Sequence, residues 1–226
     1  MAQGQGGKVR LYPKIDTLFE RDERTHKVYP DRLRHPVVAD IAKWIVTEKI
    51  DGTNIRVSFI KGETAIRLGG RTDAAQIPAD LVRYVYEAFT PAKFASAFKE
   101  DTPDGHGLVL YGEGYGAGIQ KGGAYRQDKA VILFDAAFFS VPPEDGFWWQ
   151  PDAVVTEIAE KFGIPRCPVL GEFTLPEIVE MVRGGVSSKA AQDAGLIAEG
   201  IVARTRSPLF DNRGQRLIIK LKTKDF

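Results

Sequence analysis

The sequence predicts a mixed α+β fold built on antiparallel sheets, and three observations carry this prediction. Short stretches with strand-like alternation of apolar and polar residues gather towards both ends of the chain. Stretches with the apolar spacing of helices interrupt them one at a time. The regular strand–helix alternation of a doubly wound parallel sheet does not appear. The 226 residues, 43% hydrophobic and 27% charged, have ordinary globular composition and can bury a sizeable core.

In the first half of the chain the pattern predicts mostly strands. The alternation over residues 54–60 and 64–68, around the turn Lys61-Gly62-Glu63, is typical of a hairpin. The apolar spacing over residues 78–89 predicts a helix. Three further short apolar runs are expected to form strands, namely residues 44–48, 108–111 and 130–134.

In the second half helices come first. Residues 151–162 are predicted to form a helix that Gly163 and Pro165 end. Thr174 and Glu177 have the spacing of a capping box, which opens a second helix that stops near Gly184. Two more strands, residues 201–204 and 217–221, are expected on either side of a turn at residues 211–214.

Composition excludes several classes of protein. The single cysteine, Cys167, cannot form an internal disulfide, and no apolar stretch approaches the ~18 residues of a membrane span. The first ten residues lack a signal peptide's apolar region, so we expect a cytoplasmic protein without a membrane partner. The net charge of +1 hides a stretch of eight acids and two bases over residues 144–180. The remainder therefore carries +7, which is either solvated surface or a basic working face.

A lysine that ends a strand before a tight turn, Lys49 in Glu48-Lys49-Ile50-Asp51-Gly52, is the first candidate for chemistry. Lysine attacks phosphorus or a carbonyl only as a neutral amine, so its usual pKa of about 10.4 must be lowered by burial or by nearby cations. The alternative is an exposed lysine before a hairpin turn.

The glycine-rich stretch of residues 111–123 presents one acid, Glu113. Its spacing matches a dinucleotide fingerprint, but that motif must open a helix, which the further glycines prevent. Two interpretations of this stretch remain: its backbone approaches a ligand closely, or it forms a long flexible loop. Phe134, in the apolar run 131–135, could stack on a base, although from the pattern alone core packing is favoured.

Charged residues mark the last two strands. Glu199 opens the strand 201–204, and with Glu113 it could hold a hydrated Mg²⁺. Lys220 and Lys222 share one face of their strand while Leu221 takes the other. Two ammonium groups on one face suit either protection of a sheet edge or binding of a polyphosphate.

Five segments in order, EKIDG, YGEGYG, ILFD, AEGIVAR and IIKLK, resemble the motifs of the covalent nucleotidyltransferase superfamily, which contains ATP-dependent DNA ligases, RNA ligases and mRNA capping enzymes. The stretches EKIDGTN, GEGYGAGIQKG and KLKTKDF, with an early Tyr12-Pro13-Lys14, are most similar to the RNA ligase 2 family of phages and RNA-editing ligases. The resemblance spans nearly the whole chain. It implies an antiparallel α+β nucleotidyltransferase (adenylation) domain over residues 1–226, without a C-terminal accessory or OB domain.

The resemblance also implies roles for single residues. Lys49 would be the nucleophile that takes AMP from ATP, and Lys220 and Lys222 would act with it on the phosphates. Phe134 would stack on adenine. Glu113 and Glu199 would support Mg²⁺ or Mn²⁺ through water. The implied ATP-binding residues are Glu48, Lys49, Ile50, Asn54, Arg56, Arg71, Glu113, Phe134, Glu199, Lys220 and Lys222.

The implied activity is ATP-dependent sealing of RNA ends, through lysyl-AMP and an adenylated 5′ end. The enzyme would be a monomeric, cytoplasmic repair enzyme of the kind that phages encode. RNA ends or a nicked duplex would be the partners. Asp51 stands where RNA ligase 2 relatives often have histidine, and aspartate there is typical of DNA ligases and capping enzymes. The alternatives are therefore a DNA ligase or capping-type core, or a non-catalytic nucleic-acid-binding module.

Overall fold

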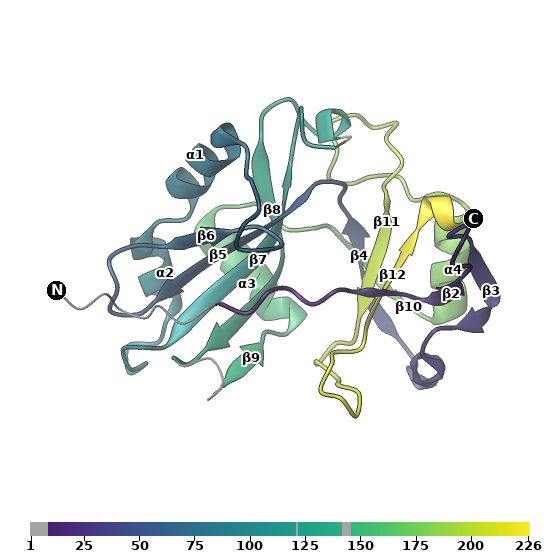
Figure 1. Cartoon of the computed structure of the whole chain (residues 1–226), viewed down its shortest axis with the longest axis horizontal. Coiled ribbons are helices and arrows are strands. Elements are labelled where there is room, and N and C mark those ends of the chain that lie inside the picture. Colours follow the sequence, from purple (N-terminus) through teal and green to yellow (C-terminus); the bar gives the residue numbers. More distant parts are fainter. Residues whose placement is uncertain (1–8, 121, 142–145) are drawn as a thin grey trace. The chain divides into compact units, whose positions relative to one another are not determined.

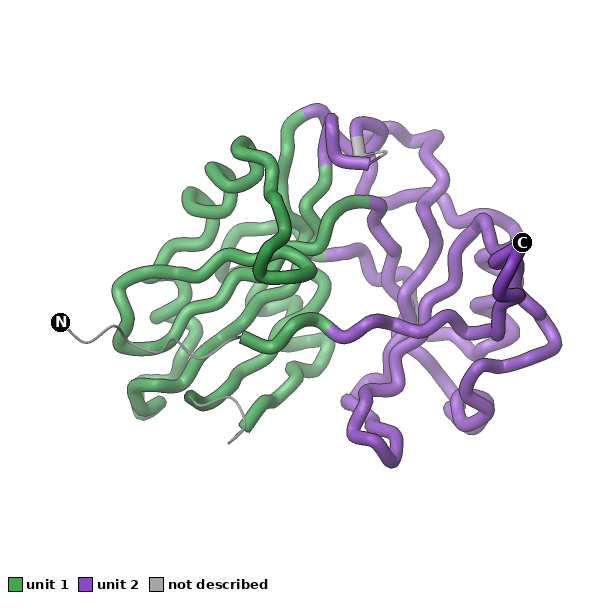
Figure 2. The backbone as a smooth tube through the Cα atoms, in the orientation of Figure 1, with its two compact units in different colours: residues 1–12, 52–115, 128–166 green, residues 13–51, 116–127, 167–226 purple. Residues whose placement is uncertain are grey.

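A computed structural model describes residues 9–120, 122–141 and 146–226 (Figure 1). The chain divides into two compact units that interleave along the sequence (Figure 2). Unit 1 comprises residues 1–12, 52–115 and 128–166, and unit 2 comprises residues 13–51, 116–127 and 167–226. Each unit has its own five-stranded sheet, in which most neighbouring strands are antiparallel. Whether residues 1–226 act as one adenylation domain stays a prediction.

The sheet of unit 1 has the strand order β6-β5-β7-β8-β9, and every neighbouring pair is antiparallel. The predicted hairpin is confirmed, since Val57 of β5 pairs with Leu68 of β6. The two strands predicted at residues 108–111 and 130–134 are longer than expected. The bounds are β5 Thr53–Ile60, β6 Arg67–Gly69, β7 Gly107–Tyr115, β8 Ala130–Phe139 and β9 Phe147–Trp149.

Three helices belong to unit 1: α1 (Ala79–Ala88), α2 (Pro91–Ala97) and α3 (Asp152–Phe162). Helix α1 buries Leu81 and Val85, which the helical spacing predicted to face the core. Helix α3 ends where the sequence indicated, because Gly163 adopts the left-handed conformation, with φ 64°, that glycine takes without a steric penalty. Helices α1 and α3 both contact β8.

The sheet of unit 2 has the strand order β1-β12-β11-β4-β10, in which only the edge pair β1–β12 is parallel among the described strands. A separate two-stranded sheet joins β2 and β3. The strands are β1 Asp16–Thr17, β2 Phe19–Arg21, β3 Val28–Leu33, β4 Trp44–Lys49, β10 Val169–Phe173, β11 Gly200–Arg204 and β12 Ile218–Lys222, and the short helical turns are η1 Pro36–Asp40, η2 Gly122–Ala124 and η4 Thr223–Asp225.

The two faces of the sheet in unit 2 differ in chemistry. Helix α4 (Leu175–Arg183), which opens with the predicted capping box, contributes Ile178 and Val182 to a core shared with one face. That face is formed by alternate residues of three strands, including Val46, Ile201 and Leu221, all fully buried. Because side chains alternate along a strand, the residues between them point away from this core. The lysines of the predicted site lie among those residues.

In the part of the chain that the structure describes, no helix is long and apolar enough to cross a membrane. Of the acidic stretch 144–180, Glu144 and Asp145 lie outside the described residues, as does Lys121 of the glycine-rich stretch.

Candidate functional site

A row of three residues across neighbouring strands of unit 2 organises the site. Gly200 of β11 is paired with Lys49 of β4 on one side and with Lys222 of β12 on the other. Residues directly opposite one another in a sheet point to the same face, so the two lysines share the face away from the core. Lys220, two residues earlier on β12, lies on that face too, whereas Leu221 is fully buried on the other. The predicted alternation along β12 is thereby confirmed.

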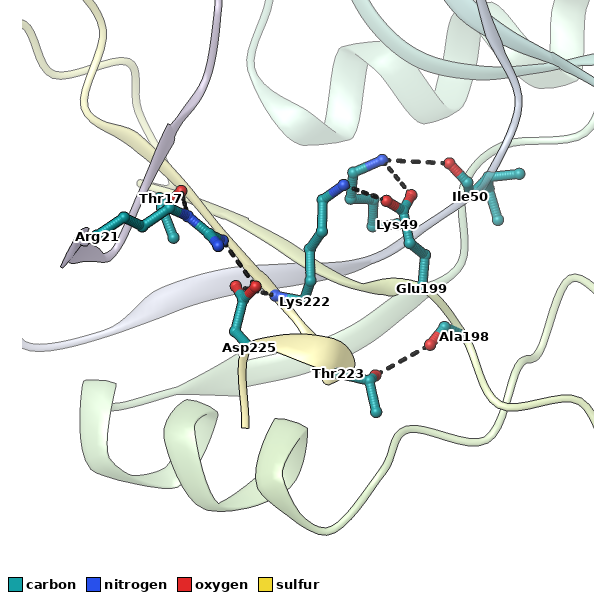
Figure 3. A network of polar contacts seen from close by, with 9 residues as sticks. All are labelled: Thr17, Arg21, Lys49, Ile50, Ala198, Glu199, Lys222, Thr223 and Asp225. Atoms are coloured by element: carbon teal, nitrogen blue, oxygen red, sulfur yellow. Dashed lines mark hydrogen bonds and ion pairs between the residues drawn. The ribbon is translucent and has the colours of Figure 1, made fainter. Parts of the chain in front are cut away.

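Glu199, the residue before Gly200, brings the two lysines together. Its Oε2 lies 2.5 Å from Nζ of Lys49, and its Oε1 lies 2.5 Å from Nζ of Lys222. Figure 3 shows both lysine side chains reaching this one carboxylate. The three side chains keep about a fifth of their surface exposed, at 22%, 23% and 17% for Lys49, Lys222 and Glu199. The cluster is therefore partly desolvated but open to a ligand.

The charge balance of this cluster favours anions. Two ammonium groups face one carboxylate, which leaves an excess of one positive charge. Burial acts to raise the pKa of Glu199, but the charges and hydrogen bonds of Lys49 and Lys222 outweigh it and hold that pKa below its ordinary value of 4.5. Glu199 is thus ionised at neutral pH, and the lysines remain available to phosphate oxygens.

Gly200 is required for the close approach of these strands. Its φ of 153° lies in a region that side chains rarely adopt, and a Cβ built there would lie 2.1 Å from the carbonyl oxygen of Leu221. A side chain at this position would push β12, and with it Lys222, away from β11.

Glu48 lies next to Lys49 in sequence, but the structure does not bring its carboxylate to the lysines. Alternation along β4 places it on the core face, where it is 1% exposed. Its carboxylate accepts hydrogen bonds from Ser188 Oγ at 2.5 Å and from the backbone N–H groups of Lys189 at 2.8 Å and Ala190 at 3.1 Å. The geometry therefore assigns Glu48 to anchoring residues 188–190, and its implied part in binding ATP stays a prediction.

Ser188 and Tyr125 are two residues near Lys49 and Glu199 that the sequence analysis did not single out. Tyr125 is 2% exposed, and its side chain hydrogen-bonds to the backbone of Asp51 and of Glu199. Burial is the main cause that raises its pKa to about 12, so the phenol is neutral. Its carbonyl accepts a 2.9 Å hydrogen bond from the N–H of Gln192. The glycines before it dominate the local pattern, and no periodicity singles it out.

In unit 1 the structure brings Asn54 and Glu113 together as a cross-strand pair of β5 and β7. The strand continues two residues beyond Glu113, so the expected strand end is displaced into the glycine-rich stretch. Gly52 allows this pairing, because a Cβ there would lie 2.3 Å from the carbonyl oxygen of Gly114. Both side chains of the pair are partly exposed.

Phe134 owes its position to a β-bulge. Tyr111 of β7 pairs with Asp135 and the next residue, Gly112, pairs with Leu133, so Phe134 has no partner in the register. A bulge commonly re-aims a side chain. The ring of Phe134 is partly exposed and meets that of Tyr12 edge-on, with centroids 4.9 Å apart. The strand predicted at residues 130–134 is too short, since β8 continues to Phe139.

Asp135 is fully buried beneath this aromatic pair. Its Oδ2 accepts a 2.8 Å hydrogen bond from the hydroxyl of Tyr12, and its Oδ1 accepts one of 3.0 Å from the N–H of Ala136. Tyr111, whose hydroxyl donates to the carbonyl of Arg10 at 2.7 Å, closes the cluster, and burial is the main cause that raises its pKa.

The two predicted arginines of unit 1 differ in surroundings. Arg56 is buried and forms an ion pair with Asp73, and a Cβ on Gly69 would lie 2.6 Å from its guanidinium. Arg56 thus connects strand β5 to the loop after β6, in which Asp73 lies. Arg71 lies exposed in the loop after β6. Ile50, after the lysine, is 3% exposed.

The acids suit a hydrated divalent cation better than a direct protein cage. Among the described residues, no group of three or more His, Cys, Asp or Glu side chains lies close enough to hold a metal ion. Mg²⁺ typically keeps several waters and takes one or two carboxylates with phosphate oxygens. Glu199 of unit 2 is such a carboxylate, whereas Glu113 belongs to unit 1 and its implied part in holding a metal stays a prediction.

Comparisons with known proteins relate this chain to RNA ligases. A family model described as RNA ligase matches residues 42–222, whereas no curated protein matches the chain. Naegleria gruberi RNA ligase with PPi is similar in fold, with 17% identity and a TM-score of 0.61 over 99% of this chain and 61% of that one. A variant of that ligase solved with ATP and Mn gives 16% identity and a TM-score of 0.60, covering 92% and 59%. Another variant solved with ATP and Mn gives 17% and 0.61, covering 96% and 63%. The chain thus spans about three fifths of these structures.

Proposed function

Because the chain belongs to the RNA ligase family, we propose that it is an ATP-dependent RNA ligase that works through a covalent lysyl-AMP on Lys49. One observation carries the proposal: Lys49 and Lys222, from strands on either side of β11, both contact Glu199 at 2.5 Å. A nucleophile, a phosphate-binding cation and a proton acceptor are therefore adjacent on one face of one sheet.

In the first step, Nζ of Lys49 attacks the α-phosphorus of ATP. An N–P bond forms, the bond from that phosphorus to the bridging oxygen breaks, and pyrophosphate leaves. The ammonium must first lose a proton, and the carboxylate of Glu199, 2.5 Å away, can accept it. Lys220 and Lys222 stabilise the negative charge that builds on the phosphate oxygens.

In the later steps the activated AMP passes to RNA. An oxygen of the 5′-phosphate attacks the phosphorus of lysyl-AMP, which frees Lys49 and leaves an adenylated 5′ end. The 3′-hydroxyl of the other end then attacks the 5′-phosphate, AMP leaves, and the phosphodiester closes. Because no water takes part in either transfer, the site must exclude it during the lifetime of lysyl-AMP.

We assign the remaining residues by their chemistry. Phe134 stacks on adenine, a contact that contributes about 1–3 kcal/mol. Asn54, Glu113 and Arg71 are assigned to nucleotide binding, and Arg56 supports the loop that carries Arg71 through its ion pair with Asp73. Glu113 and Glu199 would hold Mg²⁺ or Mn²⁺ through water, and the cation would supply positive charge that neutralises the phosphates. RNA ends or a nicked duplex are the partners that this chemistry requires.

The covalent intermediate is the direct test. The purified chain is incubated with ATP and Mg²⁺ or Mn²⁺, and its intact mass is measured. We expect the mass of one AMP to be added, and Lys49→Ala to abolish the addition. Lys43→Ala, at an exposed lysine just before β4, is the matched control and should add AMP like the wild type. If the wild type gains no AMP with either metal at any pH from about 6 to about 9, the proposal is wrong.

Donor and substrate separate the alternatives. A capping-type enzyme would take GMP from GTP, so equal labelling by GTP would favour that class. Sealing of nicked RNA, nicked DNA and single-stranded RNA is then compared, and we expect RNA ends to be sealed faster. Equal sealing of DNA nicks would favour the DNA ligase reading that Asp51 keeps open.

A further inference from the structure

A buried carboxylate that the proposed chemistry does not use lies three residues after Lys222. Asp225, in the turn η4, has a side chain that is only 1% exposed. A buried charge is costly unless it is paired and fully hydrogen-bonded. Its partner is Arg21 of β2, whose guanidinium Nη2 lies 2.6 Å from Oδ1 of Asp225.

Arg21 is itself held in place by three contacts. Its Nε donates to Thr17 Oγ1 at 3.2 Å and its Nη1 donates to the carbonyl of His26 at 2.6 Å, while Nη2 donates to Asp225. The donors of a guanidinium sit in a rigid fork, so these contacts fix its plane. Arg21 therefore offers Asp225 a fixed point on the neighbouring strands.

The other carboxylate oxygen of Asp225 contacts strand β12, which carries Lys222. Its Oδ2 accepts a 3.0 Å hydrogen bond from the backbone N–H of Lys222. The next residue, Thr223, donates its N–H to the carbonyl of Glu199 and its hydroxyl to the carbonyl of Ala198, both at 3.0 Å. Figure 3 shows Asp225 between Arg21 and the backbone of Lys222, with Glu199 held by the lysine side chains above.

We propose that Asp225 and Arg21 are positioning residues: they fix the backbone of Lys222 so that its ammonium meets Glu199 and the phosphates of ATP. Lys222 is the last residue of β12, where strand pairing ends, and its side chain is long and flexible. The proposal rests on the proposed function, because it takes Lys222 as the phosphate-binding residue. A small displacement of such a group can cost up to about 10²-fold in rate.

The test measures nucleotide binding and the first chemical step separately. Affinity for α,β-methylene-ATP, which cannot transfer AMP, reports binding, and the single-turnover rate of lysyl-AMP formation reports chemistry. We expect Asp225→Asn and Arg21→Gln each to weaken analogue binding and slow adenylation by about tenfold. The exposed ion pair Arg206–Glu172 of the same unit gives matched controls, and Glu172→Gln and Arg206→Gln should leave both quantities unchanged.

A double-mutant cycle distinguishes positioning from a general loss of stability. If Asp225 acts through Lys222, Asp225→Asn should weaken analogue binding in the wild type but not in Lys222→Gln. An equal loss in both backgrounds, or no loss in the wild type, overturns the inference. If Asp225→Asn melts below the assay temperature, Arg21→Lys, which keeps the charge but loses the fork, takes its place in the same cycle.

The two proposals fail in different ways. A wild type that neither binds the analogue nor gains AMP contradicts the proposed function. A wild type that does both, with Asp225→Asn equal to it, contradicts only the positioning role.

Discussion

Glu199 holds two ammonium groups at once, so its own ionisation decides whether the cluster is stable. The attraction of Lys49 and Lys222 lowers its pKa in the folded chain below the ordinary value of 4.5, despite the opposing effect of burial. A carboxylate with a lowered pKa stabilises the fold at pH values above its unfolded pKa. That contribution is lost as the pH falls through the folded-state value. Hydrogen bonds to charged groups contribute about 1.5–3 kcal/mol each.

The first prediction concerns pH. Glu199→Gln should lower the unfolding midpoint at neutral pH, and the gap to the wild type should narrow as the pH falls below 4.5. Thermal unfolding followed by circular dichroism at a series of pH values measures this. Lys222→Gln, which removes one of the two ammonium groups, should lower the unfolding midpoint at neutral pH by less than Glu199→Gln does. A difference in midpoint between Glu199→Gln and the wild type that stays constant down to acidic pH would contradict the stabilising role of ionised Glu199.

The second prediction concerns Gly200. Gly200→Ala forces a Cβ to within 2.1 Å of the carbonyl of Leu221 at a φ of 153°. We expect a loss of about 2 kcal/mol or more in unfolding free energy, measured by urea titration. Gly214→Ala is the matched control, since that glycine has a φ of 71° and nothing within 4 Å of the added Cβ. It should cost about 1 kcal/mol, the price of a left-handed residue alone. Equal losses of unfolding free energy in the two variants would mean that backbone strain alone, and not the contact with β12, causes the destabilisation.

At the scale of elements, the bulge in β8 positions Phe134, and the buried pair Tyr12–Asp135 supports it. Tyr12 brings the N-terminal segment of unit 1 against this strand, with its ring also 5.6 Å from that of Trp149. The hydroxyl of Tyr12 donates to a carboxylate that has no exposed surface. Removing this donor takes one hydrogen bond away from a buried carboxyl group without creating a large cavity.

We therefore predict that Tyr12→Phe lowers the unfolding free energy by about 1.5–3 kcal/mol, the range for a hydrogen bond to a charged group. In Asp135→Asn the acceptor is neutral, and the further cost of Tyr12→Phe should fall to about 1 kcal/mol. Tyr86→Phe on α1, where the ring is 55% exposed, is the control and should change stability little. Urea unfolding of the four variants provides the cycle. An equal cost of Tyr12→Phe in both backgrounds would contradict the charged acceptor.

The strands and helices that the sequence predicted are those with a strong local signal. Helices α1, α3 and α4 showed helical spacing with end signals such as Gly163 and the capping box. Strands β1, β2 and β9 have two or three residues each, too few for alternation to show, and they form because of their sheet partners. The face of Lys220 and Lys222 followed from alternation. The roles of Tyr125 and Ser188 did not, because they arise from contacts between distant segments.

At the scale of the whole molecule, the sequence divides the chain into an acidic stretch, residues 144–180, and a basic remainder. The lysines of the sheet face in unit 2 all belong to the basic remainder of the chain. Several acids of the stretch 144–180 have local structural partners: Glu177 closes the cap of α4 with Thr174, and Asp152 pairs with Arg166. These acids therefore contribute to local structure, in a helix cap and in an ion pair.

The interleaving of the two units gives a last prediction. The five strands and three helices that the structure describes in unit 1 lie between residues 52 and 166, whereas the described strands of unit 2 come from both ends of the chain. A fragment of residues 52–166 should therefore fold with a cooperative thermal transition and strand-rich circular dichroism. It lacks Tyr12, so its stability should fall by at least the 1.5–3 kcal/mol or so expected for that hydrogen bond. Adding back a segment of residues 9–12 through a flexible linker should recover part of this loss, and the same linker with Phe in place of Tyr12 is the control. A fragment without a cooperative transition would mean that unit 1 needs the rest of the chain in order to fold, because two-state unfolding is what an independent core produces.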